Sequence, residues 1–497
     1  MKYPSFFPNL RTAALAGAVL ASTFGGSAAR AADGDATPAA ATSSAVPDNA
    51  QLLRLIEAQA RQIEQLEARL AALAERGAEA TPRAPTTAGA AAPAATKILY
   101  PSEVSNRVEA LEKQAAGQPK INWSRGAAPQ FTSADGSLSF RPRGRVLIDF
   151  SGTGGSRFGG LNNSGTEVRS LRLGFEGKYN QIRWELEGDF ADNTTAWKGA
   201  YVAFGHKLFG NSADLTVGNR LHDLGIDGAS GMPSVPFQDR NVVALALQPA
   251  SGTFGVGITE RVGGDNWHAS LGVTGNDLSN PGDNNDTLTY RARAHYNPVK
   301  GKNGTVHLGA WGTYEDFAPG QGSIVRNWAI GGHFNDNVKT RAGALAGATS
   351  ASAYGVELGG FRGPFWAYGE YGRREVKSAV GARDYDAYAV SAGWFLSGAT
   401  PAYNASTGTW GGAKVAHPVT SGGAGAWELK ARYESLDYGK LPGGGEGDAW
   451  TVGVNWYLNN YSRVLFDAVL WDTDNRSGSY LGADDGYTIN TRLQLTF

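Results

Sequence analysis

Arginines at alternate positions mark the stretch FRPRGRVLIDF, where Arg141, Arg143 and Arg145 precede a run of apolar residues. A guanidinium group stays charged at physiological pH, and its planar fork can hold two oxygens of an oxyanion at once. On an extended chain these three side chains share one face at intervals of about 6.6 Å, close enough to pass an anion along. Arg291 and Arg293 repeat the spacing. The pattern therefore favours reversible binding of anions.

The segments around these arginines have the period of β-strands with one polar and one apolar face. Charged or polar residues alternate with aliphatic and aromatic ones in QIRWELEGDF, TLTYRARAHY, AWELKARYES and YTINTRLQLTF. Such strands recur from Leu138 to the end, separated by turns rich in Gly, Asn and Asp. A soluble exported sandwich would alternate too. Several full charges on each polar face, with Trp and Tyr near strand ends on the other, favour a transmembrane β-barrel with a water-filled lumen.

The strand-rich segment has room for about 16 antiparallel strands of about 10 residues. Barrels of that size leave an aqueous channel. Strand parity then gives the residues expected on the lumen face. These candidates are Arg141, Arg143, Arg145, Arg172, Arg183, Arg291, Arg293, Lys430, Arg432 and Arg492. Arginine and lysine suit anion and phosphate pores, and several weak sites conduct better than one deep site.

The first 137 residues lack the strand pattern of the rest of the chain. Lys2 and Arg11, an apolar run and the small residues before Ala32 predict a secretory signal peptide over residues 1–31. A disordered leader (32–48), a periplasmic coiled coil (49–76), an Ala/Pro/Thr linker (77–101) and a short helix with a connector (102–137) precede the barrel (138–497). Heptad spacing selects the residues expected in the coiled-coil seam. They are Leu52, Ile56, Ile63, Leu66, Leu70 and Leu73.

Composition excludes several classes of protein. The chain has no Cys, so a disulfide scaffold is excluded, and its seven His residues lack ligand spacing, so no metal or other cofactor is expected. Removing the predicted signal peptide takes away three basic residues and no acidic one, which moves the net charge from −1 to −4. No nucleic-acid partner is therefore expected. Nothing singles out a nucleophile and a base, so the sequence does not indicate an enzyme.

Seven phrases of the barrel segment resemble one family. They are EVRSLRLGFEGKYN (167–180), WELEGDFADN (184–193), ADLTVGNR (213–220), NWHASLGVTGND (266–277), YRARAHYNPV (290–299), GAWELKARYESLDY (425–438) and NWYLNN (455–460). Together they are similar to the porin O and P family of phosphate-selective porins. The resemblance implies a homotrimer of 16-stranded barrels in the outer membrane of a Gram-negative bacterium, in contact with its lipid, passing inorganic phosphate or polyphosphate through an arginine-lined lumen.

The resemblance also implies loops folded into each pore. The third loop would be Leu221–Asn241, ahead of VVALAL, with Arg240 as the constriction cation and Asp239 as its counterweight. The terminal Phe497 resembles the signal read by the outer-membrane assembly machinery.

Two alternatives stay open. In a general diffusion porin, acids such as Glu185, Glu187 and Asp189 would balance the arginines and reduce selectivity. In an envelope tether, the coiled coil would act on the peptidoglycan and the pore would be secondary. The coiled coil itself fits two strands by its Ile and Leu positions and three by the resemblance.

Overall fold

The computed structural model describes residues 117–123, 127–278, 285–301, 304–319, 323–324 and 327–497. The predicted signal peptide, leader, coiled coil, linker and short helix lie outside these residues and stay predictions. None of the helices in the described residues is long and apolar enough to cross a membrane.

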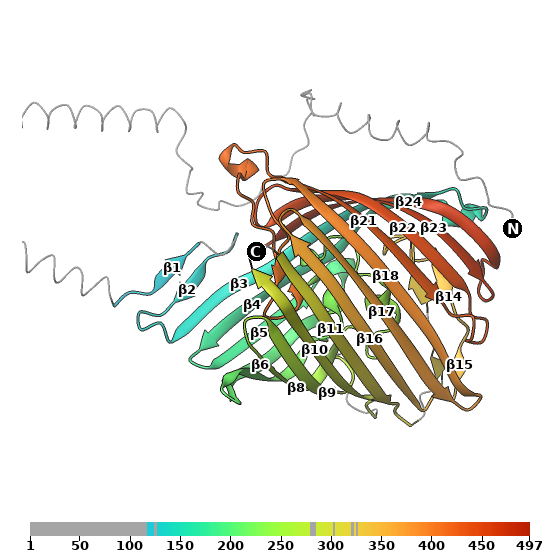
Figure 1. The fold of residues 1–497 in the computed structure, drawn as a ribbon, viewed down its shortest axis with the longest axis horizontal. Helices are drawn as coiled ribbons and strands as arrows, with labels where there is room; N and C mark the ends of the chain where they lie inside the picture. The colour runs from blue at the N-terminus through green and yellow to red at the C-terminus, as the bar shows by residue number, and fades with distance from the viewer. Residues whose placement is uncertain (1–116, 124–126, 279–284, 302–303, 320–322, 325–326) are drawn as a thin grey trace, which may run out of the picture. The chain divides into compact units, whose positions relative to one another are not determined.

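Within the described residues, sixteen antiparallel strands close into a barrel (Figure 1), which confirms the predicted fold class. Neighbours pair in chain order, and β24 pairs with β3 from Tyr487↔Gly154 to Thr496↔Arg145. Closure removes the exposed strand edges that an open sheet would have. The strands are β3 (Leu138–Gly154), β4 (Ser164–Tyr179), β5 (Ile182–Asp189), β6 (Ala196–Leu208), β7 (Asn211–Leu221), β8 (Phe254–Gly263), β9 (Trp267–Thr274), β10 (Leu288–Gly301), β11 (Gly304–Asp316), β16 (Ser350–Arg362), β17 (Phe365–Ser378), β18 (Gly381–Ser397), β21 (Ala426–Asp437), β22 (Glu446–Tyr457), β23 (Ser462–Asn475) and β24 (Gly482–Thr496).

The alternation of side chains along the strands follows the sequence pattern. On β10, Arg291, Arg293 and His295 are buried inside the barrel, whereas Tyr290 and Tyr296 are exposed on the outer face. A one-residue slip would exchange the two faces. The inward assignment of these arginines by parity therefore agrees with the register in the structure.

The two ends of the barrel carry different connections. We call the end where β3 begins the entry end and the opposite end the far end. The L3 loop (residues 222–253) and the L5 loop (residues 317–349) leave from the far end, and the T6 turn (residues 398–425) leaves from the entry end. These connections and two shorter ones contain η1 (Gly159–Leu161), η2 (Ala191–Asn193), α4 (Ile226–Ala229), η3 (Met232–Ser234), α5 (Val242–Ala246), β12 (Ser323–Ile324), β13 (Asn327–Ala329), β14 (Lys339–Arg341), β15 (Leu345–Ala346), β19 (Tyr403–Asn404), β20 (Thr409–Trp410) and η4 (Val419–Ser421).

The L3 loop is longer than the sequence indicated. The residues that follow Asn241 form α5 instead of leading directly into a strand, because the Asn241 side chain caps this helix by accepting from the Ala244 amide at 3.0 Å. The loop therefore continues to residue 253.

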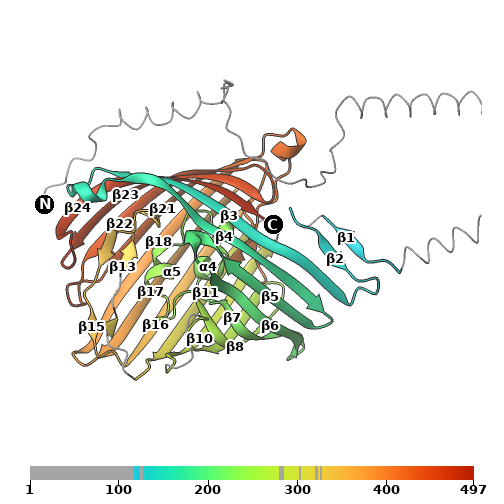
Figure 2. The same ribbon diagram turned by 180° about the vertical axis from the view of Figure 1, so that it is seen from behind.

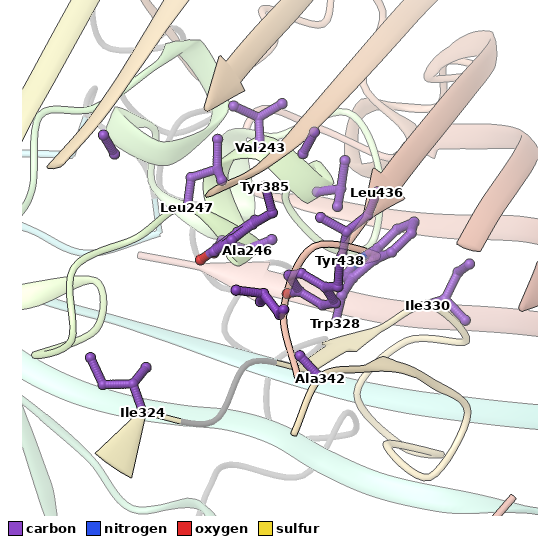
Figure 3. Close-up of a cluster of buried hydrophobic side chains, with 14 of the residues drawn as sticks. Val243, Ala246, Leu247, Ile324, Trp328, Ile330, Ala342, Tyr385, Leu436 and Tyr438 are labelled. Carbon is purple, nitrogen blue, oxygen red and sulfur yellow. The ribbon is translucent and has the colours of Figure 1, made fainter. Parts of the chain in front are cut away.

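L3 and L5 share an apolar core inside the barrel (Figure 3). Val243 of α5 and Leu247, which follows this helix, pack in the same cluster as Trp328 of L5 and as Tyr385 and Tyr438, which belong to the barrel wall and its rim. The packed side chains of this core fill part of the lumen and exclude water from it. The conducting space must therefore lie elsewhere.

The end of the chain completes the seam between β24 and β3. The Phe497 amide donates to the Gly144 carbonyl oxygen at 3.0 Å, and the Gly144 amide donates to the Phe497 carbonyl oxygen at 2.8 Å. A Cβ on Gly144 would lie 2.6 Å from the Phe497 ring, so the glycine leaves the room that the ring occupies. The role of Phe497 as an assembly signal stays a prediction.

A short hairpin precedes the barrel and was not predicted. β1 (Lys120–Asn122) pairs with β2 (Gln130–Thr132), and β2 pairs with the start of β3 (Figure 1). These strands have three residues each, too few for a period of two to stand out in the sequence.

Candidate functional site: a cation-lined channel

The L3 loop lies inside the barrel, and Figure 2 shows α4 and α5 within the ring of strands. Val235, Phe237 and Asn241, spread along the loop, have no exposed surface. A buried loop must find partners for its own backbone donors and acceptors. Inward-facing side chains of β17 and β21–β24 supply many of these partners.

Lys430 and Arg432 of β21 anchor the middle of L3. Lys430 Nζ donates to the Pro236 carbonyl oxygen at 2.7 Å and pairs with the Asp467 carboxylate at 2.6 Å. Arg432 Nη1 donates to the Asp239 carbonyl oxygen at 3.0 Å. Both side chains are almost completely buried. They hold the loop and do not line the open space.

Arg492 of β24 anchors Gln238, which lies between Pro236 and Asp239 in L3. Its Nε and Nη2 atoms each contact the Asp149 carboxylate at 2.7 Å, and Nη1 donates to the Gln238 carbonyl oxygen. The Gln238 side chain returns a hydrogen bond to Asp149 at 2.8 Å. A buried ion pair of this kind is stable only while both partners are present.

The T6 turn fills the lumen from the entry end. Arg293 Nη2 donates to the Gly408 carbonyl oxygen at 2.7 Å and pairs with the Glu357 carboxylate at 2.6 Å. The Trp410 amide donates to the Ser230 hydroxyl of L3 at 2.8 Å. L3 and T6 therefore meet inside the barrel.

The described residues leave two adjoining cavities beside L3 and T6. The central cavity has a volume of about 950 Å³, with strands β3–β7 forming most of one side and L3 and T6 part of the other. The entry cavity, of about 560 Å³, lies nearer the entry end. Arg141, Glu185, Tyr201 and Arg220 line both cavities, and we call these four residues the neck. Ten basic and five acidic side chains line the central cavity, which gives it an excess of positive charge.

Part of that positive charge is neutralised on the wall itself. Arg143 Nη1 contacts carboxylate oxygens of Glu176, at 3.1 Å, and of Glu185, and its Nε contacts Glu187 at 3.1 Å. Arg172 Nη1 contacts the second oxygen of Glu187 at 2.9 Å. These two arginines therefore present little unbalanced charge to the channel.

Six cations of the central cavity take part in no ion pair among the described residues: Arg145, Lys198, Arg220, Arg240, Lys414 and Arg463. Three of them lie close enough to interact electrostatically, because Arg145 of β3 interacts with both Lys198 of β6 and Arg240 of L3. Arg145 Nε donates to the Ser170 hydroxyl at 2.9 Å. Arg240 donates to two L3 carbonyl oxygens and lies close enough to Arg145 to interact with it electrostatically. Burial lowers the pKa of Arg240 to about 10, which leaves it charged at neutral pH. These three residues, named here the cation cluster, can attract and hold an anion.

Two cations of the central cavity were missed because they lie on β-bulges. The β3–β4 pairing skips Arg169, and the β5–β6 pairing skips Lys198. A bulge adds one residue to a strand and re-aims its side chain, so the period of two fails there. Arg220 of β7 was missed although parity would have placed it inward with Thr216.

The predicted site residues fall into two groups. Those lining the central cavity are Arg141, Arg143, Arg145, Arg172 and Arg240, and those lining the entry cavity are Arg141 and Arg183. The other group faces inward but lines neither cavity. It consists of Arg291, Arg293, Lys430, Arg432 and Arg492. Arg291 bonds to the Thr259 hydroxyl at 2.8 Å, and the other four hold L3 or T6.

The structure brings together three histidines that lie far apart in the sequence. His268, His295 and His307 lie in a row, with ring centroids 4.5 and 5.3 Å apart, and the rings of His295 and His307 are stacked. His307 Nδ1 lies 2.6 Å from the Tyr403 hydroxyl of T6, so the row supports the docked turn. The described residues contain no group of three or more His, Cys, Asp or Glu side chains that could hold a metal ion.

Comparisons with known proteins find one similar sequence and several similar structures. An uncharacterised protein of Caulobacter vibrioides is 27% identical over 477 residues, 91% of each chain. Among solved structures, the anion-selective porin of Comamonas acidovorans is 12% identical, with 72% of this chain and all of that chain covered at a TM-score of 0.46. OprB of Pseudomonas putida is 8% identical, with 72% and 94% covered at a TM-score of 0.48.

The model of one protein family, described as phosphate-selective porin O and P, matches residues 140–497. The matched segment contains every strand of the barrel except the first two residues of β3, together with L3, T6 and the cation cluster. This chain therefore belongs to the phosphate-selective porin O and P family and is an outer-membrane porin of a Gram-negative bacterium.

Proposed function

We propose that this porin is a homotrimeric, anion-selective channel for the passive uptake of phosphate or polyphosphate, and that the cation cluster is its main anion site. The observation that carries the proposal is the set of three buried or half-buried cations, Arg145, Lys198 and Arg240, on one open cavity without carboxylate partners. Uncompensated charge in a partly desolvated space is stabilised by a counter-ion. A permeating oxyanion supplies that charge.

The guanidinium of Arg145 is the strongest single ligand of this cluster. No hydrogen bond among the described residues uses its two terminal nitrogens, and both can donate to one oxyanion. Arg240 approaches from L3, on the opposite side of the cavity, and adds a second charge. The site lies on an open cavity, which suits a pore that must release what it binds.

The test is conduction in planar bilayers under a KCl gradient. We expect a reversal potential near the anion limit and a chloride current that phosphate blocks. Arg145→Gln removes charge-assisted bonds worth about 1.5–3 kcal/mol, so the half-blocking phosphate concentration should rise about ten- to a hundredfold.

Arg157→Gln is the matched control, because Arg157 bonds to the Leu481 carbonyl oxygen in the far-end loops and lines neither cavity. It loses the same charge and should leave the block unchanged. A native reversal potential near zero, with no effect of phosphate, would contradict the proposal.

A general diffusion porin is the second candidate function. The observation that favours it is the neutralisation of Arg143 and Arg172 by carboxylates of the same wall. Such internal pairs weaken the field that a solute meets. The same bilayer experiment separates the two candidates, since a general porin would discriminate little between potassium and chloride.

A further inference from the structure

Glu185 occupies an unusual place for an acid in an anion channel. It lines both cavities, so a solute that passes between them at the neck moves past its carboxylate. Its side chain is 16% exposed, which leaves it accessible to that solute. The other neck residues are the cations Arg141 and Arg220 and the neutral Tyr201.

The wall is built to hold this carboxylate at the neck. Glu185 lies directly opposite Glu176 on β4, an arrangement of like charges that costs stability unless a cation bridges it. Arg143 is that cation, since its Nη1 atom contacts both carboxylates. The Tyr201 hydroxyl donates to Glu185 at 3.0 Å. A Cβ on Gly199 would overlap the Glu185 carboxylate, so a glycine there leaves the space that the acid fills.

Arg143 can bind either the carboxylates of its own wall or a permeating oxyanion. Its Nε and Nη1 atoms already contact three carboxylates, whereas Arg145, two residues along the same strand, contacts none. An oxyanion that leaves the cation cluster toward the neck can bind Arg143 only in competition with these tethered carboxylates. A tethered ligand acts at a high effective concentration.

We propose that Glu185 is the specificity-determining counter-ligand of the neck: it competes with the permeating anion for Arg143 and so sets how fast the pore releases that anion. The inference rests on the proposed function, because it takes an oxyanion as the permeating solute. A pore that binds too tightly does not conduct, and this carboxylate keeps the second site weak. Glu187 and Glu176 hold Arg143 in place beside it.

The test is Glu185→Gln in bilayers, with phosphate block and its rate of relief as readouts. The amide keeps an oxygen that accepts from Tyr201 and Arg143 but has no charge to compete with phosphate. A partly exposed carboxylate–arginine contact of this kind is worth about 1 kcal/mol, so we expect block at about fivefold lower phosphate and correspondingly slower relief. An unchanged or weaker block would overturn the proposal.

Glu167→Gln is the matched control, because Glu167 is an inward acid of β4 that pairs with His333 and lines neither cavity. It should leave phosphate block at the native concentration; an equal effect of both variants would mean that net charge alone matters and would overturn the proposal. If E185Q does not form heat-modifiable barrels, Glu185→Asp serves instead. It keeps the charge but shortens the reach toward Arg143, and we expect an intermediate increase in affinity.

The two proposals can fail separately. If phosphate does not block the native channel, the proposed substrate is wrong, and the KCl reversal potential then decides the role of Glu185. A shift of E185Q toward the anion limit, with E167Q unchanged, would support the counter-ligand role for anions in general. Equal reversal potentials in the two variants would overturn it.

Discussion

Two walls of the barrel use inward-facing charged side chains in different ways. The open wall, strands β3–β7, presents its charges to the two cavities and pairs many of them with acids of the same wall. In the covered wall, strands β10–β24, charged side chains donate hydrogen bonds to the backbones of L3 and T6. The difference teaches that most inward arginines with a loop in front of them hold that loop instead of lining a cavity.

Arg492 should show the largest effect, because the covered wall depends on paired buried charges. Arg492→Met leaves the Asp149 carboxylate buried without its guanidinium partner and removes the hydrogen bond that Arg492 donates to L3. These losses should lower the free energy of unfolding by about 3–5 kcal/mol. The urea midpoint of the refolded barrel measures this loss. Single-channel conductance should also rise as L3 leaves the lumen.

Lys339→Met is the control for this substitution, since Lys339 pairs with a well-exposed Asp336 in L5. Its effect should stay below about 1 kcal/mol. If Arg492→Met were as mild as this control, the covered wall would not hold L3 through its charges, and the comparison between the walls would lose its basis.

Trp410 should show the next largest effect, because its side chain packs T6 against the barrel wall and donates from Nε1 to the Asp227 carboxylate of L3 at 3.2 Å. Its ring packs within 5.6 Å of the rings of Phe361, Trp366 and Tyr368. Trp410→Ala should loosen this contact at a cost of about 3 kcal/mol. We expect higher conductance and protease cleavage between residues 398 and 425 from the entry end. Resistance to protease equal to that of the native barrel would mean that the Arg293 contacts suffice to dock T6.

The faces of the strands could be predicted from the sequence, because a period of two is a local property of the chain. Arg143, Arg145 and Arg293 all face inward, as parity requires. The barrel and the number of strands followed from the same signal. Lys198 and Arg169 escaped it because the bulges beneath them interrupt the period.

What covers a face could not be predicted from the sequence. Lys430 and Arg145 have the same parity signal, yet one is bound to the Pro236 carbonyl oxygen and the other faces the cavity. The difference is made by the path of L3, whose contacts to the wall join residues some two hundred positions apart and have no period. The entry of T6 into the lumen could not be predicted either. Short turns are expected at that end of the barrel, and the sequence of this 28-residue connection has no pattern that distinguishes it from an external loop.

Arg183 should show the smallest effect and gives the sharpest test of the open wall. It faces the entry cavity, but its side chain is 48% exposed and pairs with Asp214. An exposed pair of this kind contributes less than about 1 kcal/mol, so Arg183→Gln should leave the unfolding midpoint and phosphate block close to native values. If instead it weakened the block as much as Arg145→Gln, the arginines would act as one continuous ladder whatever their pairing. The cation cluster would then be one anion site among many, because free and paired guanidinium groups would bind phosphate equally well.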